Sequence, residues 1–126
     1  MNQTEKALHL ATTCLRLKPD CSIEKLPVDA EFWPRLMSGK LGSFHHEYLV
    51  TVTNLEKDCQ QWEIHPNGDE IVVMLSGSVD FIVETEQGEQ TITVRDSGDF
   101  AFVPKGCWHT ANVLSPRTML FITAGE

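Results

Sequence analysis

Four side chains in the second half of the sequence have types and spacing suited to chemistry. Glu63, His65 and Glu70 surround an Asn-Gly pair, and His109 follows a Pro-x-Gly turn. Imidazoles and carboxylates are common protein ligands of divalent metal ions. Without a metal, the carboxylates of Glu63 and Glu70 on one face would repel each other and raise one pKa, which suits general acid and base catalysis. The residue types therefore leave two chemistries open, metal binding and metal-free proton transfer.

The Asn-Gly pair predicts a two-residue hairpin turn, because both residues tolerate the positive φ of a type I′ turn. In that register His65 faces Glu70 across the ladder, with Cβ atoms about 5 Å apart, and Glu63 shares their face. Glu70 also opens an apolar strand, 70–75, that has hydrophobic residues on both faces. Because a buried carboxylate needs a cation or strong donors, a divalent ion that also binds His65 would satisfy it.

The same residues can also be explained by purely structural roles, without metal binding or catalysis. An ordinary amphipathic strand would expose one face to solvent, with Gln61, Glu63 and His65, and bury the other in the core, with Trp62 and Ile64. A lone histidine beside a tryptophan, as at His109, is more typical of packing than of metal binding. Cys107 is expected on the side of His109, either as a thiol near the site or as a small buried hydrophobe. Trp62, Trp108, Phe100 and Phe102 are expected in the core or in a dimer interface.

The elements that must position these residues are short strands. Alternating apolar residues and Gly or Pro turns predict eight strands, at 45–54, 59–66, 69–76, 78–85, 90–95, 99–103, 107–113 and 117–124. Such a series is typical of an all-β sandwich or small barrel. Towards the N-terminus, residues 5–17 fit a short helix or an irregular arm, and residues 21–28 fit a strand. Residues 29–37 predict a short helix capped by Asp29.

The two motif stretches together resemble the cupin superfamily. The first cupin motif is H-x-H, three or four residues, Glu, six residues, Gly, and its spacing is matched by Glu63, His65, Glu70 and Gly77. The second motif is G, five residues, P-x-G, two residues, H, three residues, N, and its spacing is matched by Gly98, Pro104, Gly106 and His109. The resemblance covers roughly residues 60–113.

The sequence departs from the cupin motifs at three positions. Glu63 replaces the leading histidine of the first motif, Lys57 stands where a glycine is expected, and Val113 replaces the closing asparagine, with Asn112 beside it. The first departure bears on the metal, because it exchanges an imidazole ligand for a carboxylate. The other two concern turns and packing.

The resemblance implies an all-β fold, a small antiparallel jelly-roll (cupin) barrel with the site inside its mouth. We expect one domain over residues 1–126, with an N-terminal arm and short helix at 1–43 and the barrel at 44–126. The resemblance carries over three metal ligands, His65, Glu70 and His109, with Glu63 as the fourth.

The metal that this ligand set favours is divalent. Two imidazoles with one carboxylate are the ligand set of non-haem Fe(II) oxygenases and also suit zinc. A second carboxylate, from Glu63, neutralises the charge of the ion and makes the site more selective for the harder ions Mn²⁺ and Fe²⁺. The Irving–Williams order of affinity instead favours Zn²⁺ or Ni²⁺. We therefore expect Fe, Mn, Zn or Ni.

The expected function is that of a metal-binding cupin enzyme acting on a small organic molecule by oxygenase-, isomerase- or lyase-type chemistry. One alternative is a non-catalytic module that binds or senses a small ligand. A further alternative is metal-free acid/base catalysis by Glu63 and Glu70. The inferred cavity wall, Val72, Met74 and Ala111, hints at a partly apolar ligand. Because many single-domain cupins pair, a homodimer is expected.

Composition and charge disfavour several classes of partner. The chain of 126 residues carries a formal net charge of -8, from 10 Lys and Arg against 18 Asp and Glu, which disfavours nucleic acid and anionic membranes. The start of the sequence lacks the features of a signal peptide, and no apolar run is long enough to span a bilayer. The four cysteines show no C-x-x-C spacing and are expected to be free thiols. We expect a cytoplasmic location.

Overall fold

The computed structural model describes residues 6–55 and 59–125 of the chain. Its elements are β1 (Thr13–Leu17), β2 (Ile23–Pro27), α1 (Phe32–Met37), β3 (Tyr48–Leu55), β4 (Cys59–Glu63), β5 (Glu70–Ser76), β6 (Val79–Thr85), β7 (Gly88–Val94), β8 (Phe100–Val103), β9 (His109–Val113) and β10 (Arg117–Ala124). No helix in these residues has the length and apolar character needed to cross a membrane.

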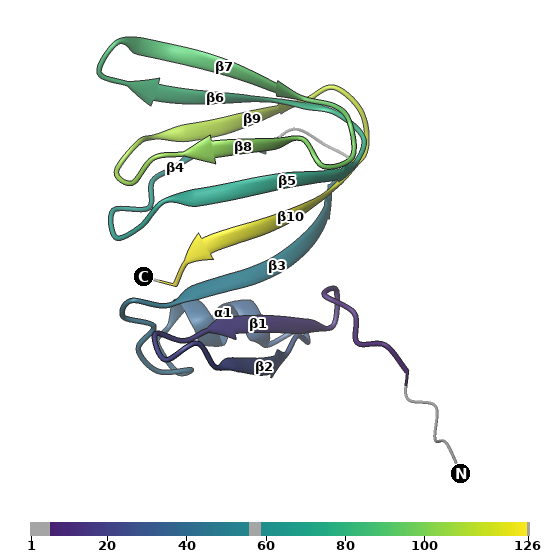
Figure 1. Cartoon of the computed structure of the whole chain (residues 1–126), viewed down its shortest axis with the longest axis vertical. Coiled ribbons are helices and arrows are strands. Elements are labelled where there is room, and N and C mark those ends of the chain that lie inside the picture. Colours follow the sequence, from purple (N-terminus) through teal and green to yellow (C-terminus); the bar gives the residue numbers. More distant parts are fainter. Residues whose placement is uncertain (1–5, 56–58, 126) are drawn as a thin grey trace.

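The strands form two antiparallel sheets (Figure 1). The larger sheet has the order β2-β1-β3-β10-β5-β8, and the smaller one has the order β4-β9-β6-β7. Neighbours that are far apart in sequence, such as β3 and β10, lie side by side, as expected when a jelly roll is wound from long connections. The predicted all-β, antiparallel jelly-roll fold with a short N-terminal helix is confirmed.

The main hydrophobic core lies between the inner faces of the two sheets. Along β5 and β6 every second residue is buried, as expected for strands with one face on a core. The cluster consists of Val72, Met74, Val79, Phe81, Val94, Ala101 and Met119. Each fully buried side chain of this kind stabilises the fold by roughly 1.5–3 kcal/mol relative to exposure.

The N-terminal segment forms part of the larger sheet. Residues 13–17 make strand β1, which pairs with β2 on one side and β3 on the other. Both alternatives expected over residues 5–17, a short helix or an irregular arm, are therefore wrong for residues 13–17, whereas the strand expected within 21–28 is confirmed as β2. The physical reason is pairing on both edges of β1, together with packing: Cys14 is fully buried in a second cluster with Phe32 and Phe44, and the Arg16 guanidinium lies 4.4 Å from the Phe44 ring centre.

The short helix α1 begins later than predicted. Its N-cap residue is Glu31, which makes no side-chain cap, so the expectation that Asp29 caps the helix is wrong. Asp29 instead accepts a hydrogen bond from the Glu31 amide at 2.9 Å, which closes a turn just before the helix. Phe32 anchors α1 in the second cluster.

The connection between β4 and β5 differs most from the prediction. These strands do not pair, because β4 belongs to the smaller sheet and β5 to the larger one, and residues 64–69 cross between the sheets. Neither Asn67 nor Gly68 has the positive φ that a type I′ turn requires. Pro66 has no amide to donate to a ladder, which disfavours a hairpin here. The role of Gly68 is close packing, because a Cβ at this position would lie 2.7 Å from the Ala124 Cβ.

Candidate metal centre

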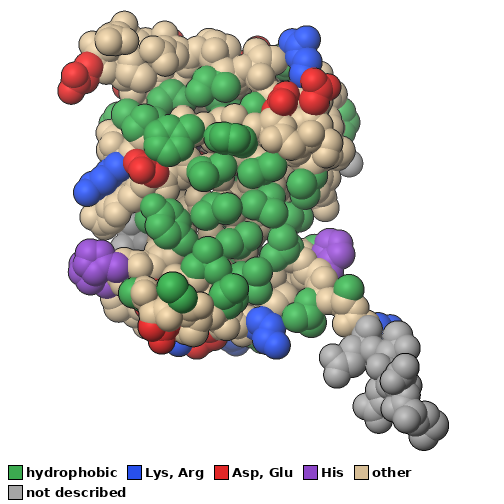
Figure 2. All heavy atoms as spheres, viewed as in Figure 1, with side chains coloured by type: hydrophobic (Ala, Val, Ile, Leu, Met, Phe, Trp, Pro, Cys, Tyr) green, Lys and Arg blue, Asp and Glu red, His purple; other side chains and the backbone are tan. Residues whose placement is uncertain are grey.

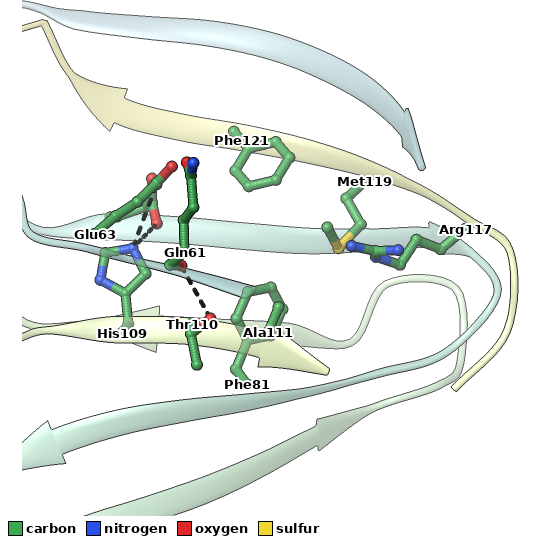
Figure 3. A pocket seen from close by; sticks show the side chains of 10 residues that line it. Gln61, Glu63, Phe81, His109, Thr110, Ala111, Arg117, Met119 and Phe121 are labelled. Carbon is green, nitrogen blue, oxygen red and sulfur yellow. Dashed lines mark hydrogen bonds and ion pairs between the residues drawn. The ribbon is translucent and has the colours of Figure 1, made fainter. Parts of the chain in front are cut away.

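The four candidate residues converge at one end of the barrel, although the predicted hairpin is absent. Glu63 ends β4, His65 lies in the crossing segment, Glu70 begins β5 and His109 begins β9. The Glu70 carboxylate oxygens lie 3.3 Å from His65 Nε2 and 3.2 Å from His109 Nε2. One Glu63 oxygen lies 3.9 Å from His65 Nε2 and 4.0 Å from His109 Nε2. Figure 3 shows Glu63 and His109 turned toward each other.

The spacing of the donor atoms fits a single ion. Glu63, His65 and His109 each offer one ligand atom, and these three atoms lie within 4.8 Å of one another. Bonds of about 2.0–2.2 Å to a shared ion place neighbouring donor atoms roughly 3–3.5 Å apart. The cluster is therefore slightly wider than a closed coordination shell, and small side-chain movements of Glu63 would close it.

The two imidazoles present their Nε2 atoms to this common point. Both Nε2 atoms are buried, and neither makes a hydrogen bond of acceptable geometry with any residue that the structure describes. His109 Nδ1 lies 3.2 Å from the Cys107 carbonyl oxygen, which accepts its proton and leaves the Nε2 lone pair free. Metal-binding histidines are usually oriented by a second hydrogen bond of this kind. The donor set therefore fits a divalent metal ion.

Two hydrogen bonds hold the motif segments against each other. The Gly106 amide donates to the His65 carbonyl oxygen at 3.0 Å, and the Lys105 amide donates to Asp69 Oδ1 at 2.7 Å. Gly106 has φ +77°, a conformation that favours glycine. These contacts explain why His65, which lies outside any strand, still faces His109.

Glu70 is buried, with 4% of its surface exposed, and it is ionised by its neighbours. Burial by itself raises the pKa of this carboxyl, but the close imidazoles of His109 and His65 and the hydrogen bond from Thr123 outweigh burial and lower the pKa to about 2. Burial likewise opposes protonation of His109, and contact with Glu70 outweighs it and raises the pKa of that imidazole. The metal-free alternative expects a raised pKa in one of the two glutamates, and Glu70 is not that one.

Thr123 is a site residue that the sequence did not reveal. Its hydroxyl donates a 2.6 Å hydrogen bond to Glu70 Oε2 and so fixes the orientation of the carboxylate. The two residues are 53 positions apart in the chain. No local pattern distinguishes Thr123 from Thr118, the other threonine of β10, so only the pairing of β10 with β5 exposes its role.

A cavity of about 60 Å³ extends from the cluster into the barrel. Of the three wall residues predicted, only Ala111 lines it, because Val72 and Met74 are fully buried in the core. The lining consists of Gln61, Glu63, Glu70, Phe81, His109, Thr110, Ala111, Arg117, Met119 and Phe121 (Figure 3).

Other candidate residues lie outside this cluster. The Cys107 thiol is not one of the candidate ligand atoms of the cluster. The contact of this residue with the site is through its carbonyl oxygen, which accepts the hydrogen bond from His109 Nδ1. His45 and His46 are exposed and line a second hollow with Tyr48 and Lys105. The four large aromatic residues assigned to the core or an interface are all partly exposed, which excludes the core: Trp62, Phe100, Phe102 and Trp108.

Comparisons with known proteins agree with this geometry. A EutQ-like cupin domain matches residues 55–118, half of the chain. A cupin-2 domain protein from Shewanella frigidimarina is 21% identical, with a TM-score of 0.52 over 61% of this chain and 70% of that one. No curated protein sequence matches the chain.

Two solved enzyme structures share the fold. Oxalate decarboxylase from Bacillus subtilis, which has Mn(II) centres, is 21% identical with a TM-score of 0.54 over 61% of this chain. The Fe(II) form of HppE is 12% identical with a TM-score of 0.50 over 60% of this chain. The matches span only 21% and 42% of those two chains, so they establish the barrel alone. From the motif spacing, the two-sheet barrel and the family match, we conclude that the chain belongs to the cupin superfamily, with a EutQ-like cupin domain.

Proposed function

We propose that the protein binds one divalent metal ion through Glu63, His65, Glu70 and His109 and acts on a small organic molecule in the adjoining cavity. The observation that carries this proposal is the pair of buried Nε2 atoms, on His65 and His109, that lack hydrogen bonds and face two carboxylates. Leaving such groups unsatisfied is costly, and a metal ion would satisfy all of them together. The occurrence of Mn(II) and Fe(II) in enzymes of this fold adds support.

The four residues have different parts in the proposed site. Glu70, buried and ionised, supplies a fixed negative charge, and Thr123 and the two imidazoles hold it in place. Glu63 is the exposed member and is therefore positioned to exchange protons between the cavity and solvent. The ion itself would supply Lewis-acid or redox chemistry, and two carboxylates make Mn or Fe better suited than a strongly acidifying Zn or Ni centre. Oxygenase-, isomerase- and lyase-type reactions are all compatible with this arrangement.

Metal content tests the proposal directly. Protein purified without a His-tag and stripped with a chelator is expected to bind one equivalent of Mn²⁺, Fe²⁺ or Zn²⁺ and to melt at a higher temperature when loaded. His109→Ala is expected to abolish binding. His9→Ala is the matched control, because this histidine precedes β1 and lies outside the cluster. Absence of stoichiometric metal in the wild type would overturn the proposal and leave acid/base catalysis by Glu63 and Glu70 as the remaining chemistry.

Turnover distinguishes an enzyme from a sensing module. A loaded protein that binds a small ligand and converts it supports an enzyme. A ligand that stabilises the protein and is recovered unchanged supports the binding or sensing alternative.

We also propose that the chain forms a homodimer through the outer face of the larger sheet. Figure 2 shows hydrophobic side chains in a nearly continuous band over this face. The strand register explains the band, because residues opposite each other share a face. Two rows cross the sheet, one of Phe102, Ile71 and Ile122 and one of Phe100, Val73 and Leu120. Contiguous apolar surface of this kind marks interaction sites.

Charge placed on this face tests the dimer. Phe102→Lys is expected to yield monomers in size-exclusion chromatography with light scattering. Trp33→Lys on α1 is the matched control, because Trp33 and Phe102 are both 48% exposed. A wild-type protein that is monomeric at micromolar concentration would contradict the dimer.

We further propose that residues 1–126 act as one domain in the cytoplasm. Strand β1 pairs directly with β3, which attaches the segment 1–43 to the barrel. Among the described residues Cys14, Cys21 and Cys107 are free thiols, which is typical of a reducing compartment. Limited proteolysis that removes the first 43 residues without lowering the melting temperature would contradict the single domain.

A further inference from the structure

A second hollow opens at the end of the barrel that also carries the proposed metal site. Its volume is about 530 Å³, against about 60 Å³ for the cavity beside the metal ligands. The two spaces share no lining residue in the described parts of the chain. Small-molecule sites commonly have volumes of about 300–1,000 Å³. The second hollow is therefore the one of the two that has room for a whole organic ligand.

Four segments that are distant in sequence line this hollow. They are residues 44–48, which lead into β3, the crossing segment at Asn67, the turn between β8 and β9 at Lys105, and the end of β10 at Ala124. Figure 1 shows these segments together at the left end of the molecule. The hollow is thus built by closure of the fold, and it does not belong to a single exposed loop.

His46 lies beside the hollow in an uncommon backbone conformation. The Glu47 amide donates to the Phe44 carbonyl oxygen at 3.0 Å, which makes His46 the third residue of a tight turn, and its φ is +59°. Glycine or asparagine usually occupies a turn position that needs positive φ. The Gly125 amide donates to the Glu47 carbonyl oxygen at 3.0 Å and so attaches this turn to the end of β10. Non-glycine residues held in this way cluster at ligand sites, so His46 is a candidate binding residue.

The charges around the hollow favour an anion. Two charged side chains belong to its lining, Glu47 and Lys105. The Glu47 carboxylate is compensated by an ion pair with Arg16. Lys105 makes no ion pair with any carboxylate that the structure describes. Asp69 accepts a hydrogen bond from the Lys105 amide at 2.7 Å, and it lies outside the lining. The lining therefore carries one positive charge that these residues leave uncompensated.

The kinds of donor in the lining favour phosphate among the common anions. Lysine binds phosphate as a compact point charge, whereas carboxylates are matched best by the two-pronged guanidinium of arginine. Imidazole, phenol and amide groups supply further hydrogen bonds, and His46, Tyr48 and Asn67 provide them here. The Tyr48 hydroxyl lies 3.3 Å from the position that a Cβ on Gly68 would take, so it is held against the crossing segment.

The size and the apolar part of the lining indicate that the anion carries an organic group. Phe44 and Ala124 contribute apolar surface, and Phe44 is fixed in the second hydrophobic cluster. Inorganic phosphate would fill only a small part of about 530 Å³. The remaining space is suited to a small organic body attached to the phosphate.

We propose that this hollow binds a phosphorylated small organic molecule. Lys105 and His46 contact the phosphate, and Phe44 and Ala124 contact the organic group. The site is separate from the proposed metal centre and does not depend on it.

Titration of the ¹⁵N-labelled full chain with two anions tests the class of ligand. Inorganic phosphate is expected to shift the backbone amide signals of His46 and Lys105 in a saturable manner. Acetate at equal ionic strength is expected to bind at least tenfold more weakly, because it has less charge and fewer acceptor oxygens. Unshifted His46 and Lys105 signals, or equal affinities for phosphate and acetate, would overturn the proposal.

The organic part of the ligand is tested with glycerol 3-phosphate. This probe is expected to shift the same amide signals and to bind more tightly than inorganic phosphate, whereas glycerol alone is expected to leave the signals in place. Inorganic phosphate that binds as tightly as glycerol 3-phosphate would contradict a site for an organic phosphate.

Variants at the two binding residues test the assignment to this hollow. Lys105→Gln is expected to bind phosphate at least tenfold more weakly. The matched control is Lys25→Gln, which removes the same charge from an exposed position on β2 outside the lining, and wild-type affinity is expected for it. His46→Gly accepts the positive φ and removes the imidazole, so weaker binding is expected. Wild-type affinity in either Lys105→Gln or His46→Gly would refute the site, and the wild-type titration keeps it testable if a variant does not fold.

Removal of metal separates this site from the proposed metal centre. Phosphate can also bind to a metal ion, so the titration is repeated after treatment of the wild type with a chelator. The shifts of His46 and Lys105 are expected to be unchanged. Loss of these shifts on metal removal would assign the phosphate to the metal centre and overturn the separate site. A wild type that binds no metal would end the metal proposal alone.

Discussion

Glu63 lies directly opposite His109 in the ladder between β4 and β9. This pairing brings together the carboxylate that replaces the first histidine of the cupin motif and the histidine of the second motif. Because the two are neighbours within one sheet, their side chains point into the barrel from the same face. Glu70 approaches them from the other sheet. The candidate metal centre therefore joins the two sheets, and its ligands depend on the closure of the barrel.

Replacing Glu63 by histidine tests its place in the metal site. Glu63→His restores three imidazoles and one carboxylate, which raises the net charge of the loaded centre by one and suits Zn²⁺ better than Mn²⁺. We expect a folded protein with tighter Zn²⁺ binding and weaker Mn²⁺ binding, measured by calorimetry. Glu63→Ala, the control, is expected to weaken both. Unchanged affinities in Glu63→His would show that Glu63 does not bind the ion.

The low pKa of Glu70 predicts how the metal-free protein responds to acid. Its folded pKa is about 2 and its ordinary value is 4.5, so the carboxylate stabilises the fold fully above the ordinary value. That contribution, on the order of 3 kcal/mol, is lost as the pH falls from about 5 toward 2. In Glu70→Gln the free energy of unfolding is expected to vary much less over this range, as measured by urea denaturation.

The exposed Glu89 provides the control for this measurement. Glu89→Gln is expected to keep the pH dependence of the wild type. A Glu70→Gln profile as steep as that of the wild type would assign the acid sensitivity to other carboxyls.

Gly68 is predicted to be intolerant of a side chain for steric reasons. Its φ is not positive, so alanine is conformationally acceptable, but the new Cβ would lie 2.7 Å from the Ala124 Cβ. Gly68→Ala is expected to reduce the free energy of unfolding by about 1–3 kcal/mol, as overpacking does. The double variant with Ala124→Gly removes the clash and is expected to recover most of the loss. Equal destabilisation of the single and double variants would contradict this contact as the cause.

The cysteines are predicted to differ in reactivity. Cys14 is fully buried, and burial raises the pKa of its thiol to about 11, whereas Cys21 is exposed. Because the thiolate is the reactive form, iodoacetamide at mildly alkaline pH is expected to label Cys21 and spare Cys14 in the folded protein. Peptide mass spectrometry measures both, and labelling in urea is the control that makes them equivalent. Rapid native labelling of Cys14 would show that β1 opens readily.

Much of the fold is readable from local patterns. Two-residue alternation along β6 and the glycine and proline turns predicted the succession of strands from 45 to 124. These signals are local because a strand with one buried face repeats every second residue whatever its partner. The same two-residue repeat predicted Glu63 on the inner face of its strand and Glu70 at the start of a buried strand. The four candidate side chains therefore converge although the hairpin expected to bring them together is absent.

Strand pairing and the cavity were decided by tertiary structure. The local sequence of residues 64–69 resembles that of a hairpin turn. In the structure, however, β4 is hydrogen-bonded to β9, whereas β5 is hydrogen-bonded to β10 and β8. Segments such as 13–17, which suit more than one conformation, become strands because an open sheet edge is available to them. Thr123 acquires its role in the same way, from a contact with Glu70 across 53 positions of sequence. Local residue patterns determine which faces are apolar, whereas backbone hydrogen bonding between distant segments determines which faces meet.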